Sequence, residues 1–302
     1  MKLNKMLCIT ALLLSGSIVL SGCVKNKRSK YHSIELGYYP QDVALTTLKE
    51  ELDKQIPNSN DIITYKDVKY KKIFTTPYSD EYNYHSTKLP VDSGEYQYFE
   101  IMPIKWRVLD ETDEYYYVTS ADILFTSSFA REIDKSDEYE PRDYKNSYIR
   151  QYLNDYIYND VLECDSSIMK IEVSNQYEYN SNIDDKLETY EDYVTLLSAS
   201  DIKKEYTFSK QDDLYAFASD YVIAQGQMTY QESPNSFYFA SCDYFLRSKT
   251  KFYDGVGKYD SSESVYKIDM IGQSKEASVY DTLGIRPCLK INKQIYKDNH
   301  SK

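Results

Sequence analysis

The chain has 302 residues, with 48 acidic side chains against 36 Lys and Arg, and a formal net charge of −12 at pH 7. This acidic balance argues against a nucleic-acid-binding protein, which needs a basic patch or stripe. The length allows one large domain or two small ones. The 34 tyrosines against one tryptophan suit sugar- or protein-binding surfaces, although codon drift in an AT-rich genome explains the same bias.

The first 22 residues have the order of a bacterial secretory signal. Lys2 and Lys5 provide a positive start and are followed by a mainly apolar run over Met6–Leu20. This run is shorter than the roughly 20 residues that a membrane-spanning helix needs, and it matches the apolar region of a signal peptide. We therefore expect residues 1–22 to be a signal peptide that is absent from the mature protein.

Residues 20–23 read Leu-Ser-Gly-Cys and resemble the lipobox of bacterial lipoproteins. In a lipobox the cysteine receives a diacylglycerol, and the peptide is cut just before it. We expect Cys23 to be the lipidated residue, carrying palmitate-type acyl chains that hold the protein on the extracytoplasmic face of the cell membrane. Residues 23–33 would then form a short basic tether. The alternative is an ordinary signal peptide with a chance cysteine.

The first part of the mature chain is predicted to mix helices and strands. Apolar residues recur at helical spacing within residues 45–56 and again within residues 146–161, so both stretches are expected to be helices. The clearest strand signal is Ile104–Leu109, in which apolar residues alternate with cationic ones. Tyr115–Thr119 is expected to pair with it as a hairpin, and Val68–Phe74 suggests one or two further short strands.

The second part is predicted to contain one helix and several strands. Residues 212–224 follow a helical pattern with Gly226 as its stop. Short strands are expected over Val194–Ser198, Phe237–Ala240, Tyr244–Arg247, Val265–Ile271 and Ile285–Ile291. Pro287 indicates that the last of these is an edge strand or begins irregularly. The expected fold class is α+β, with mixed, mainly antiparallel sheets and about three helices.

Short stretches along the mature chain resemble, in order, a bacterial family of secreted and surface proteins known as domain of unknown function 6273. The stretches are Leu36–Gln41, Pro103–Leu109, Ser147–Asn154, Leu196–Ser198, Tyr244–Ser248 and Gly284–Leu289. Three positions depart from the family pattern, since Phe245 stands in place of a tryptophan, Lys249 in place of a proline and Cys288 in place of an alanine. The resemblance covers residues 34–292, which implies a single domain followed by a polar tail over residues 293–302.

The closing pattern of this family is similar to that of C-type-lectin-like folds, including the formylglycine-generating-enzyme type. The shared elements are an aromatic-Leu-Arg-Ser strand, a glycine-bearing turn and a final Gly-Ile-Arg-Pro strand. The terminal strands of that fold pair in the core, so the resemblance implies that Cys242 and Cys288 lie close enough for a disulfide. Free buried thiols are the alternative.

The sequence provides no catalytic set and no familiar metal motif. Its three histidines are His32, His85 and His300, and neither a nucleophile elbow nor a zinc or EF-hand spacing accompanies them. We therefore expect no catalytic residue, no metal ligand and no cofactor. The acidic clusters Asp134–Glu140 and Glu188–Asp192 leave calcium as an open alternative to solvated loops.

Five residues within the family-like stretches are the candidates for ligand binding. They are Trp106, Arg107, Arg150, Arg247 and Arg286. The structural interpretation of the same residues is a buried indole together with guanidinium groups that satisfy carboxylates and backbone carbonyls.

We expect a non-catalytic module of the cell envelope that binds an extracytoplasmic glycan or protein. One alternative is a carboxylate-dependent enzyme acting on glycans or cell-wall polymer. Another is a structural or assembly component of the envelope, which would show large apolar patches.

Overall fold

The computed structural model describes residues 32–131, 141–174, 189–203, 214–250 and 263–300. Contacts divide the chain into Met1–Tyr31 and His32–Lys302, and all described residues belong to the second unit. The predicted signal peptide, Cys23 and the acidic segment 134–140 therefore lie outside the described residues. Within the described ranges, no helix combines the length and apolar character that crossing a membrane requires.

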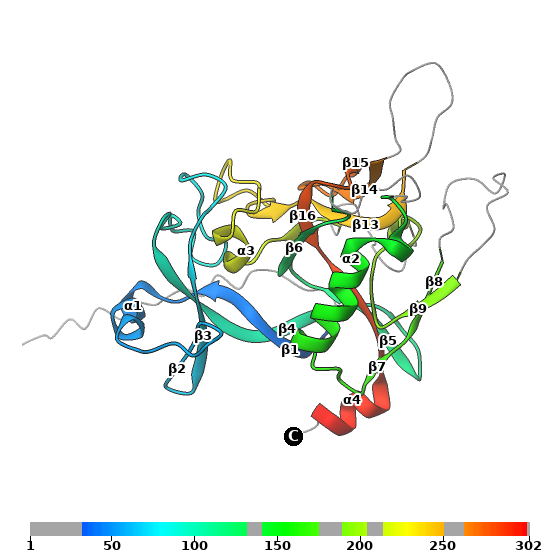
Figure 1. Ribbon diagram of the computed structural model, residues 1–302, viewed down its shortest axis with the longest axis horizontal. Helices are drawn as coiled ribbons and strands as arrows, with labels where there is room; N and C mark the ends of the chain where they lie inside the picture. The colour runs from blue at the N-terminus through cyan, green and yellow to red at the C-terminus, as the bar shows by residue number, and fades with distance from the viewer. Residues whose placement is uncertain (1–31, 132–140, 175–188, 204–213, 251–262, 301–302) are drawn as a thin grey trace, which may run out of the picture. The chain divides into compact units, whose positions relative to one another are not determined.

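The larger sheet has eight strands in the order β10–β17–β5–β4–β3–β2, with β1 also paired to β4 and β7 to β17 (Figure 1). Its pairings are antiparallel. The strands are β1 (Ser33–Val43), β2 (Ile62–Tyr65), β3 (Val68–Phe74), β4 (Tyr96–Glu111), β5 (Tyr115–Ser120), β7 (Ile168–Met169), β10 (Val194–Leu196) and β17 (Pro287–Asn292). The last strand, β17, thus has neighbours on both sides.

A second sheet has five strands in the order β15–β14–β13–β16–β6. Only one of its pairings, between β13 and β16, is parallel. Its strands are β6 (Phe125–Ser128), β13 (Tyr244–Lys249), β14 (Ser264–Ile268), β15 (Ser274–Ser278) and β16 (Thr282–Ile285). Two small ribbons pair β8 (Ile171–Ser174) with β9 (Thr189–Asp192), and β11 (Ala216–Phe217) with β12 (Ser241–Cys242).

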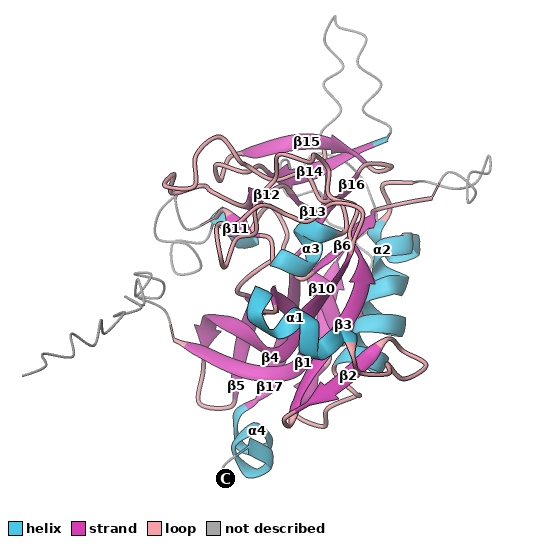
Figure 2. Cartoon of the chain, turned by 90° about the vertical axis from the view of Figure 1, so that its left-hand side faces the viewer, coloured by secondary structure: helices cyan, strands magenta, loops and turns pink. Residues whose placement is uncertain are grey.

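The described residues form four α-helices, seen in cyan in Figure 2 together with shorter helical turns. They are α1 (Thr46–Asp53), α2 (Tyr148–Gln151), α3 (Asp220–Ala224) and α4 (Lys293–His300), with α2 continuing as the π-helix η3 (Tyr152–Val161) and with 3₁₀ turns η2 (Tyr144–Asn146) and η4 (Asp201–Lys203). The side chain of Ser147 accepts a hydrogen bond from the Arg150 backbone N–H, so it caps α2.

The largest core cluster lies where the helical segment α2–η3 covers the larger sheet. Trp106 of β4 packs in the same cluster as Leu153 and Ile157 of η3. Close approach of β1 to the end of η3 depends on Gly37, whose φ is +74° and whose added Cβ would lie 2.8 Å from Leu162 Cδ2. A larger residue there would be strained in its backbone and would also clash with the helix.

The α+β class with mainly antiparallel sheets is confirmed, as are the helices predicted within residues 45–56 and 146–161 and the β4–β5 hairpin. The helix predicted over residues 212–224 is wrong in extent. Ala216 and Phe217 pair with β12, and the helix begins only after its cap at Ser219. Tertiary pairing has overridden the helical pattern. The strand predicted over Phe237–Ala240 is also wrong, since these residues form a turn.

The predicted final strand is divided by Arg286 into β16 and β17, which belong to different sheets. The predicted irregular start at Pro287 is therefore confirmed. The alternative, an edge strand, is wrong because β17 pairs with strands on both sides. The polar tail predicted after residue 292 contains α4. The hydroxyl of Tyr296 in this helix donates a hydrogen bond of 2.9 Å to the Glu35 backbone oxygen, which ties the helix to the start of β1.

Cys242 and Cys288 are both buried free thiols, so the disulfide implied by the resemblance is not formed. Cys242 lies in β12 and Cys288 in β17, which belong to different sheets. Both side chains pack in one apolar cluster. Burial raises the pKa of the Cys288 thiol to about 12 and raises the pKa of the Cys242 thiol further above its usual range.

Thiol labelling of the folded protein is expected to modify Cys164 and to spare Cys242 and Cys288. Cys164 is exposed, whereas the other two are inaccessible and almost fully protonated near neutral pH. The measurement is iodoacetamide labelling at pH 8 with peptide mass spectrometry, before and after denaturant. Labelling of Cys288 at the rate of Cys164 in the native protein would contradict the burial.

Candidate functional site

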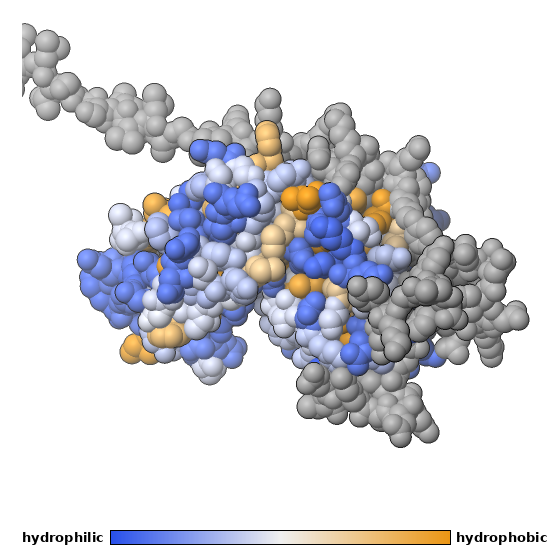
Figure 3. All heavy atoms as spheres, turned by 90° about the horizontal axis from the view of Figure 1, so that it is seen from above, coloured by the Kyte–Doolittle hydropathy of each residue, from blue (hydrophilic) through white to orange (hydrophobic). Residues whose placement is uncertain are grey.

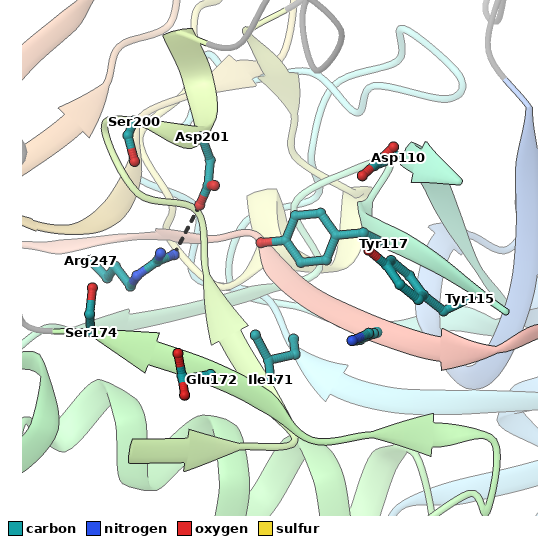
Figure 4. Close-up of a pocket in the computed structure, with 10 residues that line it drawn as sticks. Asp110, Tyr115, Tyr117, Ile171, Glu172, Ser174, Ser200, Asp201 and Arg247 are labelled. Carbon is teal, nitrogen blue, oxygen red and sulfur yellow. Dashed lines mark hydrogen bonds and ion pairs between the residues drawn. The ribbon is translucent and has the colours of Figure 1, made fainter. Parts of the chain in front are cut away.

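A polar pocket of about 340 Å³ lies where the strands β5 and β17, the ribbon strand β8 and the turn η4 approach one another (Figure 4). The side chains that line it are Asp110, Tyr115, Tyr117, Ile171, Glu172, Ser174, Ser200, Asp201, Arg247 and Lys290. They combine two aromatic rings, three carboxylates, two cationic groups and two hydroxyls. Such a volume is within the range of small-molecule sites, and the lining is more polar than most of them.

Strand alternation builds the floor of the pocket. Tyr115 and Tyr117 of β5 point to the pocket, while their neighbours Tyr116 and Val118 are buried in the core. Lys290 of β17 lies opposite Tyr117 in the strand register, and the residues on either side of it are buried. Because successive side chains of a strand point to opposite faces, the same strands supply the core and the pocket.

Arg247 and Asp201 form a fixed pair in the wall of the pocket. Arg247 Nη1 donates to Asp201 Oδ2 at 3.1 Å, and the two side chains are only 16% and 9% exposed. Arg247 also donates to the Leu196 backbone oxygen, while Asp201 accepts from the Ser198 backbone N–H at 2.9 Å. Backbone groups therefore hold both partners, and the guanidinium is presented in one orientation.

The hydroxyl of Tyr117 is directed away from solvent and interacts with the Cys288 thiol. Burial, followed by the proximity of Cys288 and Asp201, raises the pKa of Tyr117 well above its ordinary value. The phenol is therefore neutral at physiological pH and is a poor candidate for a general base. The Tyr117 ring links the pocket to the core beneath it, where Cys288 is buried.

Three charged groups of the pocket remain without an opposite charge among the residues that the structure describes. The ammonium of Lys290 lies 4.2 Å from the centroid of the Tyr115 ring, which is a cation–π contact. Asp110 accepts a hydrogen bond of 2.9 Å from the backbone N–H of Glu111. Glu172 lies at an exposed position of β8. These groups are available to a ligand, whereas Arg247 and Asp201 already hold each other.

The structure does not gather the five predicted site residues into one place. Only Arg247 lines the pocket. Trp106 is fully buried and donates from Nε1 to the Leu36 backbone oxygen at 2.8 Å, so it is a core residue. Arg107 is half-buried in β4.

Arg150 and Arg286 perform structural tasks. Arg150 forms an ion pair with Asp192 through Nε and Nη2, and the shortest distance, from Nη2 to Oδ1, is 2.6 Å. Arg286 is buried and donates from Nε to the Ser120 backbone oxygen at 3.0 Å and from Nη1 to the Tyr244 hydroxyl at 3.3 Å. The structural interpretation therefore holds for these two residues.

Sequence reasoning missed the remaining pocket residues. The available signal was alternation, because a lysine at position 290 between two apolar residues indicates a strand with one solvated face. Tyr115 and Tyr117 carry no such signal, because Tyr116 between them is the same type of residue. Alternation alone does not tell which solvated face is concave, since concavity depends on β8 and η4, which are distant in sequence.

No cluster of three or more His, Cys, Asp or Glu suited to a metal ion occurs within the described ranges. In the acidic segment Glu188–Asp192, residue 188 lies outside these ranges, and Asp192 and Glu191 are engaged by Arg150 and Lys170. Ion pairs thus occupy the described carboxylates that were considered for calcium.

The model of the family described as "Domain of unknown function (DUF6273)" matches residues 117–293 of this chain. The chain belongs to this family. No curated protein and no solved structure matches it. The DUF6273 match begins at Tyr117 on the pocket floor and ends just after β17. It therefore contains most of the pocket lining, and Asp110 and Tyr115 are supplied by the preceding hairpin.

Proposed function

We propose that this DUF6273 protein is an extracytoplasmic lipoprotein, anchored through Cys23, whose domain binds a glycan or protein ligand without catalysis. The observation that carries the proposal is the pocket that Tyr115, Arg247 and Lys290 line, in which Lys290 has no ion-pair partner among the described residues. Aromatic faces beside hydrogen-bonding and charged groups are the features with which proteins hold polar ligands such as sugars. A C-type-lectin-like origin of the fold is part of the same proposal.

The place where the chain enters the domain is compatible with such an anchor. His32 accepts a backbone hydrogen bond of 3.0 Å from Val108 and lies 3.9 Å from Glu111, next to the hairpin that supplies Asp110 and Tyr115. Cys23 lies nine positions before His32, so the chain between them can extend over at most about 30 Å.

The test is a glycan array combined with a pull-down from envelope extracts, using the lipidated mature protein in detergent. Tyr115→Ala is expected to lower the affinity of the captured ligand at least about tenfold, because it removes an aromatic wall and the support of Lys290. Tyr78→Ala is the matched control, since Tyr78 is 62% exposed and is not part of the pocket. Absence of any ligand in both assays, or equal loss with the two variants, would contradict the proposal.

A second candidate function is a carboxylate-dependent enzyme acting on glycans or cell-wall polymer. The observation that favours it is the presence of Asp110, Glu172 and Asp201 in one pocket. An enzyme of this type needs two carboxylates on either side of the scissile bond. It predicts that wall polysaccharide is cleaved, and that Asp110→Asn or Glu172→Gln abolishes release of reducing ends while binding remains. A binding module shows no release with any variant.

A structural component of the envelope would be expected to carry large apolar surfaces. On the face seen in Figure 3, hydrophilic residues predominate and hydrophobic ones occur in separate small groups. This face therefore lends no support to that alternative, and binding through the pocket remains the function we propose.

A further inference from the structure

The charges of the pocket point to the chemistry of its ligand. Lys290, Asp110 and Glu172 have no ion-pair partner among the described residues, although Arg247 and Asp201 in the same pocket are paired. The pocket thus presents one available positive group and two available negative groups. In the free protein, water solvates these groups.

A bound ligand would displace much of this water. A charged group that loses its water without gaining an opposite charge or hydrogen bonds costs several kcal/mol. A neutral sugar could offer the charged groups of the pocket only hydrogen bonds from its hydroxyls. A ligand with a single charge could pair either with the ammonium or with the carboxylates, but not with both. The lowest cost belongs to a ligand that carries both signs.

The anionic part of such a ligand would contact Lys290. The ammonium is held over the Tyr115 ring, and Lys290 extends from β17, which has neighbouring strands on both sides. Its three donors are therefore presented from a rigid element. Arg247, which lies on the opposite side of Figure 4 from Tyr115, is already paired with Asp201 and contributes less to binding an anion.

The cationic part would be received by the carboxylates. In Figure 4, Asp110 and Glu172 lie on opposite sides of the Tyr117 ring. A tyrosine face attracts a cation, and a carboxylate beside it supplies charge-assisted hydrogen bonds. An ammonium that enters the pocket would therefore find an aromatic face and carboxylates in the same lining.

We propose that the pocket recognises a zwitterionic group, which combines a free amine with a carboxylate or phosphate. The inference rests on the proposed binding function and specifies the ligand class. The same chemistry occurs in a free amino acid and in an amino sugar that bears an acid. The experiment has an arm for each of these sources.

The test is isothermal titration of the mature, lipidated protein in detergent with two matched series. One series is muramic acid, glucosamine, glucuronic acid and glucose, and the other is alanine, alanine amide and N-acetylalanine. Within at least one series the zwitterion, muramic acid or alanine, is expected to bind at least about tenfold more tightly than every analogue with one charge or none. Raised salt should weaken this preference, because exposed charges are screened.

Variants assign the two charges. Lys290→Gln should reduce zwitterion affinity to that of the amine-only analogue, and the double variant Asp110→Asn with Glu172→Gln should reduce it to that of the acid-only analogue. Lys69→Gln and Glu276→Gln are matched controls at exposed positions that are not part of the pocket.

Two outcomes would overturn the inference, and they separate it from the proposed function. If neutral or singly charged probes bind as tightly as the zwitterions and Tyr115→Ala weakens them, the zwitterion inference is wrong and the binding function stands. If no probe binds and the array and pull-down are also empty, both are wrong. Unchanged zwitterion affinity in Lys290→Gln would contradict the assignment of the anion site.

Discussion

Replacing Trp106 by alanine is expected to lower the free energy of unfolding by about 3–5 kcal/mol. Trp106 is fully buried and is among the largest completely enclosed side chains of the described domain. Its loss opens a cavity between β4 and the helical segment α2–η3, and it removes the hydrogen bond to the Leu36 backbone oxygen. That oxygen would remain buried without its indole donor, which adds to the cost of the cavity.

The effect is measured by urea denaturation followed by far-UV circular dichroism, because Trp106 is the only tryptophan and its fluorescence is lost with it. Trp106→Phe keeps most of the volume and should cost about 1–3 kcal/mol less than alanine. Phe237→Ala is the control, since Phe237 is 85% exposed and should change stability by less than about 0.5 kcal/mol. A loss below about 1 kcal/mol in Trp106→Ala would contradict the core position of this residue.

The sequence predicted those elements whose stability is decided locally. The helical pattern within residues 146–161 has its own cap at Ser147 and an apolar stripe that includes Leu153 and Ile157, so it could be recognised without knowledge of its neighbours. The same holds for the β4–β5 hairpin, whose strands are adjacent in sequence. The π geometry of η3 was not predictable, because the apolar spacing of a π-helix closely resembles that of an α-helix over so short a length.

Elements that depend on distant pairing were predicted less well. Residues 212–224 have a helical pattern, but the pairing of Ala216 and Phe217 with β12 delays the helix to Asp220. The division of the final strand at Arg286 was invisible for a similar reason. That division places β16 and β17 in different sheets.

The residues of the pocket were predicted least well, because the pocket also depends on contacts between distant parts of the chain. Its residues come from the β4–β5 hairpin, β8, η4, β13 and β17, which are widely separated in the chain. The motifs that resemble the family identified residues such as Trp106 and Arg286, which serve the core. Arg247 was predicted because it belongs to the family-like stretch Tyr244–Ser248, and it also lines the pocket. Lys290 and Tyr115 belong to no motif; strand alternation indicates the solvated position of Lys290, and no sequence pattern indicates that of Tyr115.

Replacing Arg150 by methionine is expected to destabilise the domain by about 3–5 kcal/mol. The reason is the position of Asp192, whose side chain is only 2% exposed and receives Nε and Nη2 of Arg150. Methionine retains an aliphatic stem, but it also loses the cation–π contact in which Arg150 Cζ lies 4.6 Å from the centroid of the Tyr190 ring. The loss therefore arises chiefly from a buried carboxylate without a counter-charge, and less from lost packing.

A double-mutant cycle separates the charge from the packing. Asp192→Leu alone should cost less than Arg150→Met, because the guanidinium it leaves behind is 28% exposed and can be hydrated. The double variant should be more stable than Arg150→Met alone, since no charge is then stranded. Urea denaturation of the four proteins at pH 7 gives the coupling energy. A double variant whose loss equals the sum of the single losses would show that the two residues act independently, which would contradict an ion pair that joins α2 to β9.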